Sequence, residues 1–249
     1  GARSDDPGRY DDFAWISSIH TEDGRHVEAL VHVEYQGHRR PDRCPAGEYD
    51  ACWRNAITRL VSSDGGVSFA PPEEGRLVAT APHRYTGREG GRTGYFSPSN
   101  ILRAGDHLHV FIRAEALGAQ QAGTCLLRRP ADAPGAAWRA FDGAAFDVAF
   151  LDPYAETGAA GDHVCAPVGG LRSTLWSVLR HEPTGAYLGV TATTLRTADG
   201  APTSGIWWTA SADLLDWSRP RLLMAAPLLW RPDCAAREAF HYPSLLDDD

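Results

Sequence analysis

The sequence predicts an all-β protein, and more specifically a β-propeller of four-stranded blades, from three observations. Helical periodicity is scarce along the 249 residues, and most apolar segments are short, β-branched or aromatic, and bounded by Gly, Pro and Asp. Three segments run from a strand through an Asp-containing turn to an aromatic residue that opens another strand. Each of these segments follows a candidate pair of strands, so a four-stranded unit repeats along the chain.

The turns that end the three units share an acidic residue followed by an aromatic ring. The acidic residues are Asp64, Asp132 and Asp213, and the aromatic residues are Phe69, Trp138 and Trp217. The clearest turn, SSDGGVSF, places two glycines and several short polar residues between apolar runs. An Asp side chain accepts hydrogen bonds from turn amides, and an aromatic ring can cover the turn and pack into the strand layer. We therefore expect a hairpin of this kind at the end of each unit.

The strands expected before these turns form three units and the start of a fourth. The expected pairs are 13–19 with 28–35, 96–102 with 107–114, and 164–171 with 186–194, and the segment 240–246 matches a first strand. Alternation is clearest in 107–114, where every second residue is apolar. The predicted units span about residues 13–75, 95–147 and 160–225, with another starting at 238–249.

We therefore predict one propeller domain over residues 1–249, of the five-bladed type. A propeller ring closes because open strand edges would remain unpaired. Three units and the first strand of a fourth are too few for five blades. Either the ring has fewer blades than usual or the chain is a piece of a longer five-bladed ring. The alternative fold is an irregular β-sandwich whose loops contain Asp and Trp.

Composition and charge exclude several classes of function. The formal net charge is −8, which argues against a nucleic-acid partner. All 24 basic residues of the Lys and Arg count are arginines, so Schiff-base chemistry and a Walker lysine are excluded. The most apolar stretch, 222–230, is too short for a membrane span, which needs about 20 residues.

The cysteines favour a disulfide over a zinc site. The five cysteines are Cys44, Cys52, Cys125, Cys165 and Cys234, and none forms a CxxC pair. Cys44 and Cys52 flank a loop in which Pro45 and Gly47 let the chain fold back, so a local disulfide is predicted there. Such a bond indicates an oxidising compartment, and we expect a secreted or periplasmic protein. Because the number of cysteines is odd, at least one of them has no disulfide partner within the chain.

Two of the turns resemble those of known propeller families. The pattern Ser62-x-Asp64-x-Gly66-x-Ser68-Phe69 resembles the Asp box, or BNR repeat, of sialidase-like propellers, whose pattern is Ser-x-Asp-x-Gly-x-Thr-Trp. The segment 211–220 resembles the equivalent hairpin of five-bladed glycosidases of families 43 and 32. The segments 96–102 and 240–246 resemble blade-opening strands of that group. The resemblance implies a carbohydrate ligand over a central channel, and an Asp box with a structural role on the outer rim.

Glycosidases of this kind need two carboxylates that face the scissile bond. Enzymes of family 43 type carry acidic residues on the inner strands, whereas the matching strands here have none in their core and are only flanked by acids. The candidate catalytic residues are Glu34, Glu238, Asp152 and Asp162. Glu34 or Glu238 is the predicted general acid, because each lies among aromatic and imidazole groups that can raise a carboxyl pKa. Asp152 or Asp162 is the predicted partner.

The predicted ligand-binding residues lie on or beside the expected inner and second strands. They are His32, Ser97, Asn100, Arg113, His163, His241 and Tyr242. No ligand spacing predicts a metal site, and the sequence leaves the cofactor unknown. A sialidase is not predicted, because the Phe-Arg-Ile-Pro motif of many sialidases is absent.

Two alternatives to a glycosidase remain open. The first is a non-catalytic propeller that binds a glycan or a protein and lacks the acid pair. The second is a propeller recruited to other chemistry, with His163 and His241 lining the channel.

Overall fold

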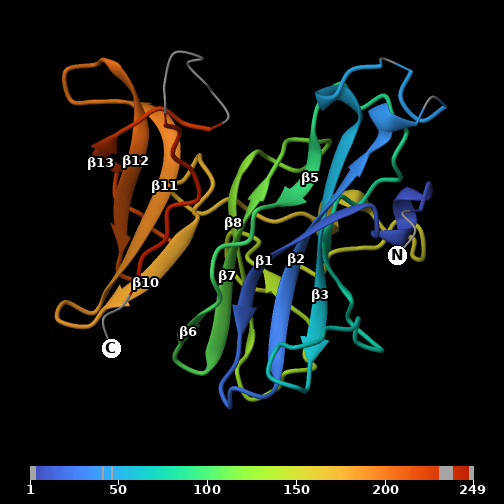
Figure 1. Cartoon of the computed structure of the whole chain (residues 1–249), viewed down its shortest axis with the longest axis horizontal. Coiled ribbons are helices and arrows are strands. Elements are labelled where there is room, and N and C mark those ends of the chain that lie inside the picture. Colours follow the sequence, from blue (N-terminus) through green and yellow to red (C-terminus); the bar gives the residue numbers. More distant parts are fainter. Residues whose placement is uncertain (1–3, 41, 46, 230–237, 247–249) are drawn as a thin grey trace. The chain divides into compact units, whose positions relative to one another are not determined.

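The computed structural model describes residues 4–40, 42–45, 47–229 and 238–246. It divides into two compact units, residues 1–167 and 168–249 (Figure 1). Both units are built from β-strands, so the predicted all-β class is confirmed. The described helices are short 3₁₀ turns, namely η1 (Pro7–Arg9), η2 (Gly37–Arg39), η3 (Asp50–Cys52) and η4 (Ala160–His163). None of them is long and apolar enough to cross a membrane.

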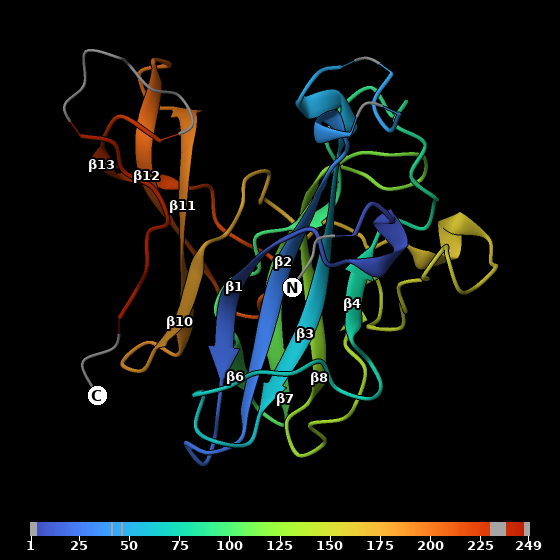
Figure 2. The ribbon, with the colours of Figure 1, turned by 45° about the vertical axis from the view of Figure 1, so that its right-hand side comes forward.

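Unit 1 begins with four antiparallel strands in chain order. They are β1 (Phe13–His20), β2 (Val27–Gln36), β3 (Trp53–Ser62) and β4 (Leu77–Thr80). Figure 2 shows these strands side by side. In the register between β1 and β2, Phe13 lies opposite Glu34 and Trp15 opposite His32. β1 is the edge strand and is mostly exposed, whereas β2 and β3 are buried on both faces.

A second group of strands in unit 1 continues from β3. It comprises β5 (Thr93–Phe96), β6 (Leu102–Ala104), β7 (His107–Ala114), β8 (Gly123–Pro130) and β9 (Arg139–Ala140). β5 joins the two groups by a parallel pairing in which Asn55 lies opposite Gly94. A Cβ atom on Gly94 would lie 2.0 Å from the carbonyl oxygen of Asn55, and its φ is +89°, so only glycine fits this close approach.

Unit 2 contains a single four-stranded antiparallel sheet. Its strands are β10 (Ser177–His181), β11 (Ala186–Arg196), β12 (Pro202–Ser211) and β13 (Arg221–Ala225). The first strand was expected at 164–171, but that stretch forms only an isolated bridge, between Gly169 and Asp216. Gly170 has a φ of +81°, a conformation that interrupts a strand. The sheet therefore starts later than the sequence pattern indicates.

Two of the three predicted acidic turns share a hydrogen bond from a serine hydroxyl to the Asp side chain two residues later. At the first, the Ser62 hydroxyl donates to Asp64 and accepts from the Gly66 amide, and Asp64 also accepts from Ser68. At the end of β12, the Ser211 hydroxyl likewise donates to Asp213, which accepts from following backbone amides.

The turn at Asp132 is built differently. Its main-chain bond runs from the amide of Ala136 to the carbonyl of Ala133, and no bond to the Asp132 side chain is found among the described residues. The aromatic part of the pattern is nevertheless present, because Trp138 is buried in the core.

The core of unit 1 lies between the β1–β4 and β5–β9 groups. Its largest fully buried side chains include Leu30, Ile57, Tyr95, Leu108 and Leu127. A buried ion pair lies at one end of this core, where Arg129 donates to Glu28, and the Trp138 indole donates to the same carboxylate at 3.0 Å. Buried charges are tolerated where they are paired and hydrogen-bonded in this way.

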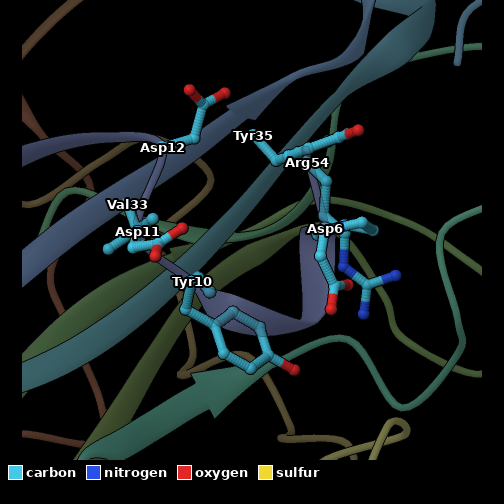
Figure 3. A pocket seen from close by; sticks show the side chains of 9 residues that line it. Asp6, Tyr10, Asp11, Asp12, Val33, Tyr35 and Arg54 are labelled. Atoms are coloured by element: carbon cyan, nitrogen blue, oxygen red, sulfur yellow. The ribbon is translucent and has the colours of Figure 1, made fainter. Parts of the chain in front are cut away.

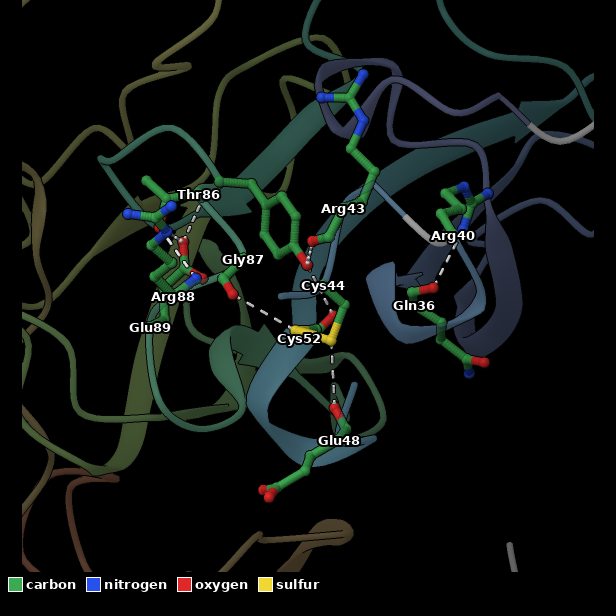
Figure 4. Close-up of a disulfide and its surroundings, with 11 residues drawn as sticks. Gln36, Arg40, Arg43, Cys44, Glu48, Cys52, Thr86, Gly87, Arg88 and Glu89 are labelled. Carbon is green, nitrogen blue, oxygen red and sulfur yellow. Dashed lines mark hydrogen bonds between the residues drawn. A yellow bond between two sulfur atoms is a disulfide. The ribbon is translucent and has the colours of Figure 1, made fainter. Parts of the chain in front are cut away.

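Two disulfides stabilise unit 1. The predicted Cys44–Cys52 bond is present and closes the loop that leads into β3 (Figure 4). A second bond joins Cys125 of β8 to Cys165 and was not predicted, because 40 residues separate the two cysteines. Cys234 lies outside the described residues.

The described sheets have open edges and do not close into a ring. Ring closure, the number of blades, the bounds of the four-stranded units and the single propeller domain over 1–249 remain predictions.

Candidate functional site

The two faces of β2 carry different chemistry. Side chains alternate along a strand, so His32 and Glu34 lie on one face, and Val33 and Tyr35 lie on the other. The second face packs against Tyr10 and lines a small pocket of about 10 Å³ (Figure 3). That volume is close to what one water molecule needs, so the pocket is too small for a sugar. The face of His32 and Glu34 is the candidate site.

Glu34 is a buried carboxyl group with few partners. It is 9% exposed and accepts a hydrogen bond of 2.9 Å from the Gln36 side-chain amide. Its second oxygen lies 3.8 Å from Nε2 of His32. Burial raises the pKa of Glu34 above its usual range, while Gln36 and the positive charge of Arg92 oppose the rise. Glu34 is therefore a weaker acid than a solvated glutamic acid.

His32 is held as a neutral imidazole. Its Nε2 lies 2.8 Å from Oδ1 of Asn55, and the Asn55 amide nitrogen donates to the carbonyl of Thr93 at 3.3 Å. Because Oδ1 can only accept, Nε2 carries the proton and Nδ1 is left as an acceptor. Burial lowers the pKa of His32 to about 4, and the positive charge of Arg92 adds to this effect. The ring is uncharged at neutral pH.

Aromatic rings surround this imidazole. Trp15 on β1 is 47% exposed, and its ring centroid lies 6.1 Å from that of His32. Phe13 stacks on Trp15 at 6.1 Å with an angle of 16° between the rings. On the other side, the Phe96 ring lies 5.9 Å from His32. Trp15 thus offers an accessible aromatic face beside polar groups.

A guanidinium group completes the site. Arg92 donates to Glu115 at 2.7 and 3.1 Å, and its Cζ lies 4.5 Å from the Phe96 ring and 5.1 Å from the Trp53 ring. Arg113 lies 3.8 Å from the other oxygen of Glu115. Burial lowers the pKa of Arg113, and Glu115 opposes this shift.

The disulfide-closed loop contributes Tyr49 near the same place. Its ring lies 4.7 Å from the rings of both Trp53 and His38. We refer to the side chains of Trp15, His32, Glu34, Asn55, Arg92 and Phe96 as the His32–Glu34 cluster. The cluster combines an exposed aromatic plane with a neutral imidazole, a weakly acidic carboxyl group and a fixed guanidinium.

Several predicted site residues lie in or beside this cluster. His32 and Glu34 are members, and Arg113 contacts Glu115, the partner of Arg92. Ser97 follows Phe96 and is buried, whereas Asn100 is exposed on the connection to β6. A role for these residues in ligand binding remains a prediction.

Asp152 lies on the opposite face of the sheet from Glu34. It accepts hydrogen bonds from the Tyr10 hydroxyl at 2.8 Å and from the Tyr154 amide at 3.0 Å. Tyr10 packs with Val33 on the second face of β2. A sheet therefore separates Asp152 from Glu34, so the two carboxyl groups do not face one ligand.

Asp162 and His163 lie in η4. Asp162 is exposed and lines an open groove of about 520 Å³ with Asp142 and Asp147. His163 bonds through Nδ1 to the carbonyl of Ala149 at 2.7 Å. No group of three metal-ligating side chains occurs among the described residues.

The remaining predicted residues belong to unit 2. Glu238 is exposed, and His241 and Tyr242 pack with Trp176, at ring distances of 4.9 and 4.8 Å.

Sequence reasoning missed Trp15, Asn55, Arg92 and Phe96 as site residues. Trp15 could have been found, since it is a large aromatic residue in the strand expected at 13–19, next to Ala14 and Ile16. Arg92 could not, because it lies in a loop and reaches the cluster only through the parallel pairing of β3 and β5.

Comparisons with known proteins give few matches. No family model and no curated protein matches the chain. A protein of unknown function from Dyadobacter fermentans is 13% identical, with a TM-score of 0.45, over 86% of this chain and 52% of that one. An α-L-arabinanase from Cellvibrio cellulosa, solved in complex with arabinohexaose, is 12% identical, with a TM-score of 0.40, over 88% of this chain and 62% of that one. The chain spans less than two-thirds of the length of either protein.

Proposed function

We propose that this protein is a propeller-like carbohydrate-binding protein and that unit 1 holds the sugar at the His32–Glu34 cluster. The proposal depends on one observation: the half-exposed Trp15 ring lies beside the neutral His32 and the carboxyl group of Glu34. The five-bladed and Asp-box character suggested by the sequence belongs to the same proposal.

The chemistry of a sugar matches these groups. A pyranose or furanose ring has apolar C–H faces, which pack on an aromatic plane, and a rim of hydroxyl groups, which need donors and acceptors. Trp15 supplies the plane. Nδ1 of His32 and the oxygens of Glu34 can accept from hydroxyl groups, and the Arg92 guanidinium can donate to them.

Hydrolysis of a glycoside is the second candidate, favoured by the raised pKa of Glu34. A glycosidase needs a partner carboxylate about 5–10 Å from the acid. Among the described residues, Asp12 is bound by both terminal nitrogens of Arg40 at 2.9 Å, and Glu115 is bound by Arg92. Both neighbouring acids are engaged in ion pairs, so binding is the function that the geometry supports better.

The test of binding is a glycan array probed with the full chain, followed by calorimetric titration of the best ligand. Trp15→Ala should weaken binding by at least about tenfold, or about 1.4 kcal/mol. Val67→Ala is the matched control, because Val67 is 87% exposed in the Asp64 turn and should bind as the wild type does. Binding that is absent for the wild type, or unchanged by Trp15→Ala, would reject the proposal.

The test of hydrolysis uses the same ligands. Release of reducing ends by the wild type that is abolished in Glu34→Gln would assign Glu34 as the general acid. Turnover that persists in Glu34→Gln would exclude that role.

We also propose a secreted or periplasmic location. Two disulfides in one unit fit an oxidising compartment. Thiol counting on protein from native cell fractions would test this, since protein from a reducing compartment would show all its cysteines free.

A further inference from the structure

A short motif occurs twice, once in each unit. Ser97-Pro98-Ser99 follows β5 in unit 1, and Tyr242-Pro243-Ser244 lies near the end of unit 2. In both, the residue before proline has a φ of 52°, in the left-handed region. The two segments are therefore related in backbone conformation as well as in sequence.

This conformation is strained. A residue that precedes proline favours extended backbone, and residues other than glycine rarely adopt positive φ. Such strain persists only where the surroundings fix it, and it is concentrated at ligand sites and switches. The Ser97 segment adjoins the His32–Glu34 cluster through Phe96. The Tyr242 segment adjoins a second group of aromatic rings.

The second group consists of Trp176, His241 and Tyr242, which we call the Trp176–Tyr242 cluster. The ring centroids lie 4.4–4.9 Å apart and the rings are close to perpendicular. Tyr242 is 57% exposed, so one aromatic ring is available at the surface of unit 2. These rings pack on one another and leave no enclosed cage for a cation.

Two polar atoms beside these rings have no partner. The Trp176 amide donates to Val190 at 2.9 Å, and Ser177 lies opposite Val190, so the register places Trp176 opposite Thr191. Nε1 of Trp176 and Oγ1 of Thr191 are both buried, and neither has a hydrogen-bond partner among the described residues. A buried donor without a partner is destabilising, so a polar ligand group that reached the Trp176 indole N–H would stabilise it.

We propose that the Trp176–Tyr242 cluster is a second carbohydrate-binding surface, located in unit 2. The exposed Tyr242 ring stacks on the C–H face of a sugar, and a hydroxyl on the rim of that sugar accepts from the Trp176 indole N–H. This N–H is buried in the structure and the rings of His241 and Tyr242 pack against the indole, so binding requires a neighbouring ring to turn and expose the N–H. The choice of a sugar as ligand rests on the proposed function, through the likeness of the two Pro-Ser segments.

The experiment follows the indole N–H signals of the full chain by NMR, after labelling tryptophan with ¹⁵N. Trp176→Phe and Trp15→Phe assign the two signals of interest. Cello-, xylo-, arabino- and manno-oligosaccharides are titrated into the wild type and into a Trp15→Ala/Glu34→Gln variant that lacks the unit 1 site. A saturable shift of the Trp176 signal in both proteins is expected with at least one of these sugars.

A second variant tests the role of Tyr242 without disturbing the core. Tyr242→Ala should weaken the Trp176 response by about tenfold in affinity. Tyr187→Ala removes another partly exposed aromatic ring of unit 2 and should leave the response unchanged.

The outcomes separate the two proposals. A Trp176 signal that does not move, while the Trp15 signal does, overturns the second site and leaves the first intact. A Trp176 shift that disappears in the Trp15→Ala/Glu34→Gln variant also overturns it, because the shift then comes from unit 1. If neither signal moves with any of these sugars, both proposals are wrong.

Discussion

Nε2 of His32 lies 2.8 Å from Oδ1 of Asn55, and this contact fixes both the orientation and the tautomer of the imidazole. Asn55 is fully buried, and its own amide nitrogen donates to the backbone next to Gly94. The ring that faces the proposed ligand is therefore positioned by the parallel junction of β3 and β5.

The first prediction concerns pH. The folded-state pKa of His32 is about 4 and an unfolded histidine titrates near 6.5, so the unfolded chain binds the proton more readily between these values. Stability should fall as pH drops from about 6.5 to 4, by about 3 kcal/mol from this group. Urea unfolding at several pH values should show that the free energy of unfolding falls less between about pH 6.5 and pH 4 in His32→Gln than in the wild type.

The comparison with His32→Gln isolates this residue, because His109 is also buried and has a pKa lowered to about 4. Equal pH dependence of the wild type and His32→Gln would contradict the assignment of a buried neutral imidazole.

The second prediction concerns the buried ion pair of Glu28 and Arg129. Glu28→Leu leaves the Arg129 charge and the Trp138 indole without their partner, so it should destabilise the protein by about 3–5 kcal/mol. The double variant Glu28→Leu/Arg129→Met removes both charges. Its loss of unfolding free energy should be clearly smaller than the sum of the losses in the two single variants. A double-mutant cycle from urea denaturation measures this coupling, and strictly additive losses would argue against it.

The third prediction compares the acidic turns. Asp64→Ala and Asp213→Ala each remove an acceptor of several hydrogen bonds, and those bonds lower the pKa of both carboxyl groups. Both variants should lower Tm without changing ligand affinity. Asp132→Ala should leave Tm close to the wild-type value, since its turn is held by main-chain bonds. Calorimetry of the three variants is the measurement, and an equal drop in all three would mean that Asp132 has an equivalent role.

The fourth prediction concerns the disulfides. The chain-entropy model gives about 4 kcal/mol for the 40-residue separation of Cys125 and Cys165, and about 2.5 kcal/mol for the 8-residue separation of Cys44 and Cys52. Replacing Cys125 and Cys165 together by Ala should therefore destabilise the protein more than the same change at Cys44 and Cys52. Urea unfolding of the two double variants measures which disulfide contributes more to the free energy of unfolding. A larger loss at Cys44 and Cys52 would show that local packing dominates over loop closure.

The candidate site was only partly predictable. Glu34 and His32 were found because acidic and imidazole groups in a strand that is otherwise apolar are conspicuous. Asp152 was grouped with Glu34 on type alone, yet it bonds to Tyr10 on the other face. A one-residue change of position along a strand reverses the face, so residue type without register cannot say which acids meet.

The sequence by itself determined the elements whose causes are local. Short apolar runs bounded by turn residues indicated several strands, and alternation indicated the strand at 107–114. The Ser62–Asp64 turn followed from short polar side chains and glycines, and the Cys44–Cys52 bond followed from a short loop. Only the tertiary structure decided which elements meet. The parallel contact at Gly94, the Cys125–Cys165 bond and the place of Arg92 beside Glu34 all join segments distant in the chain. Such contacts depend on the packing of whole sheets, and no short window of sequence encodes that packing.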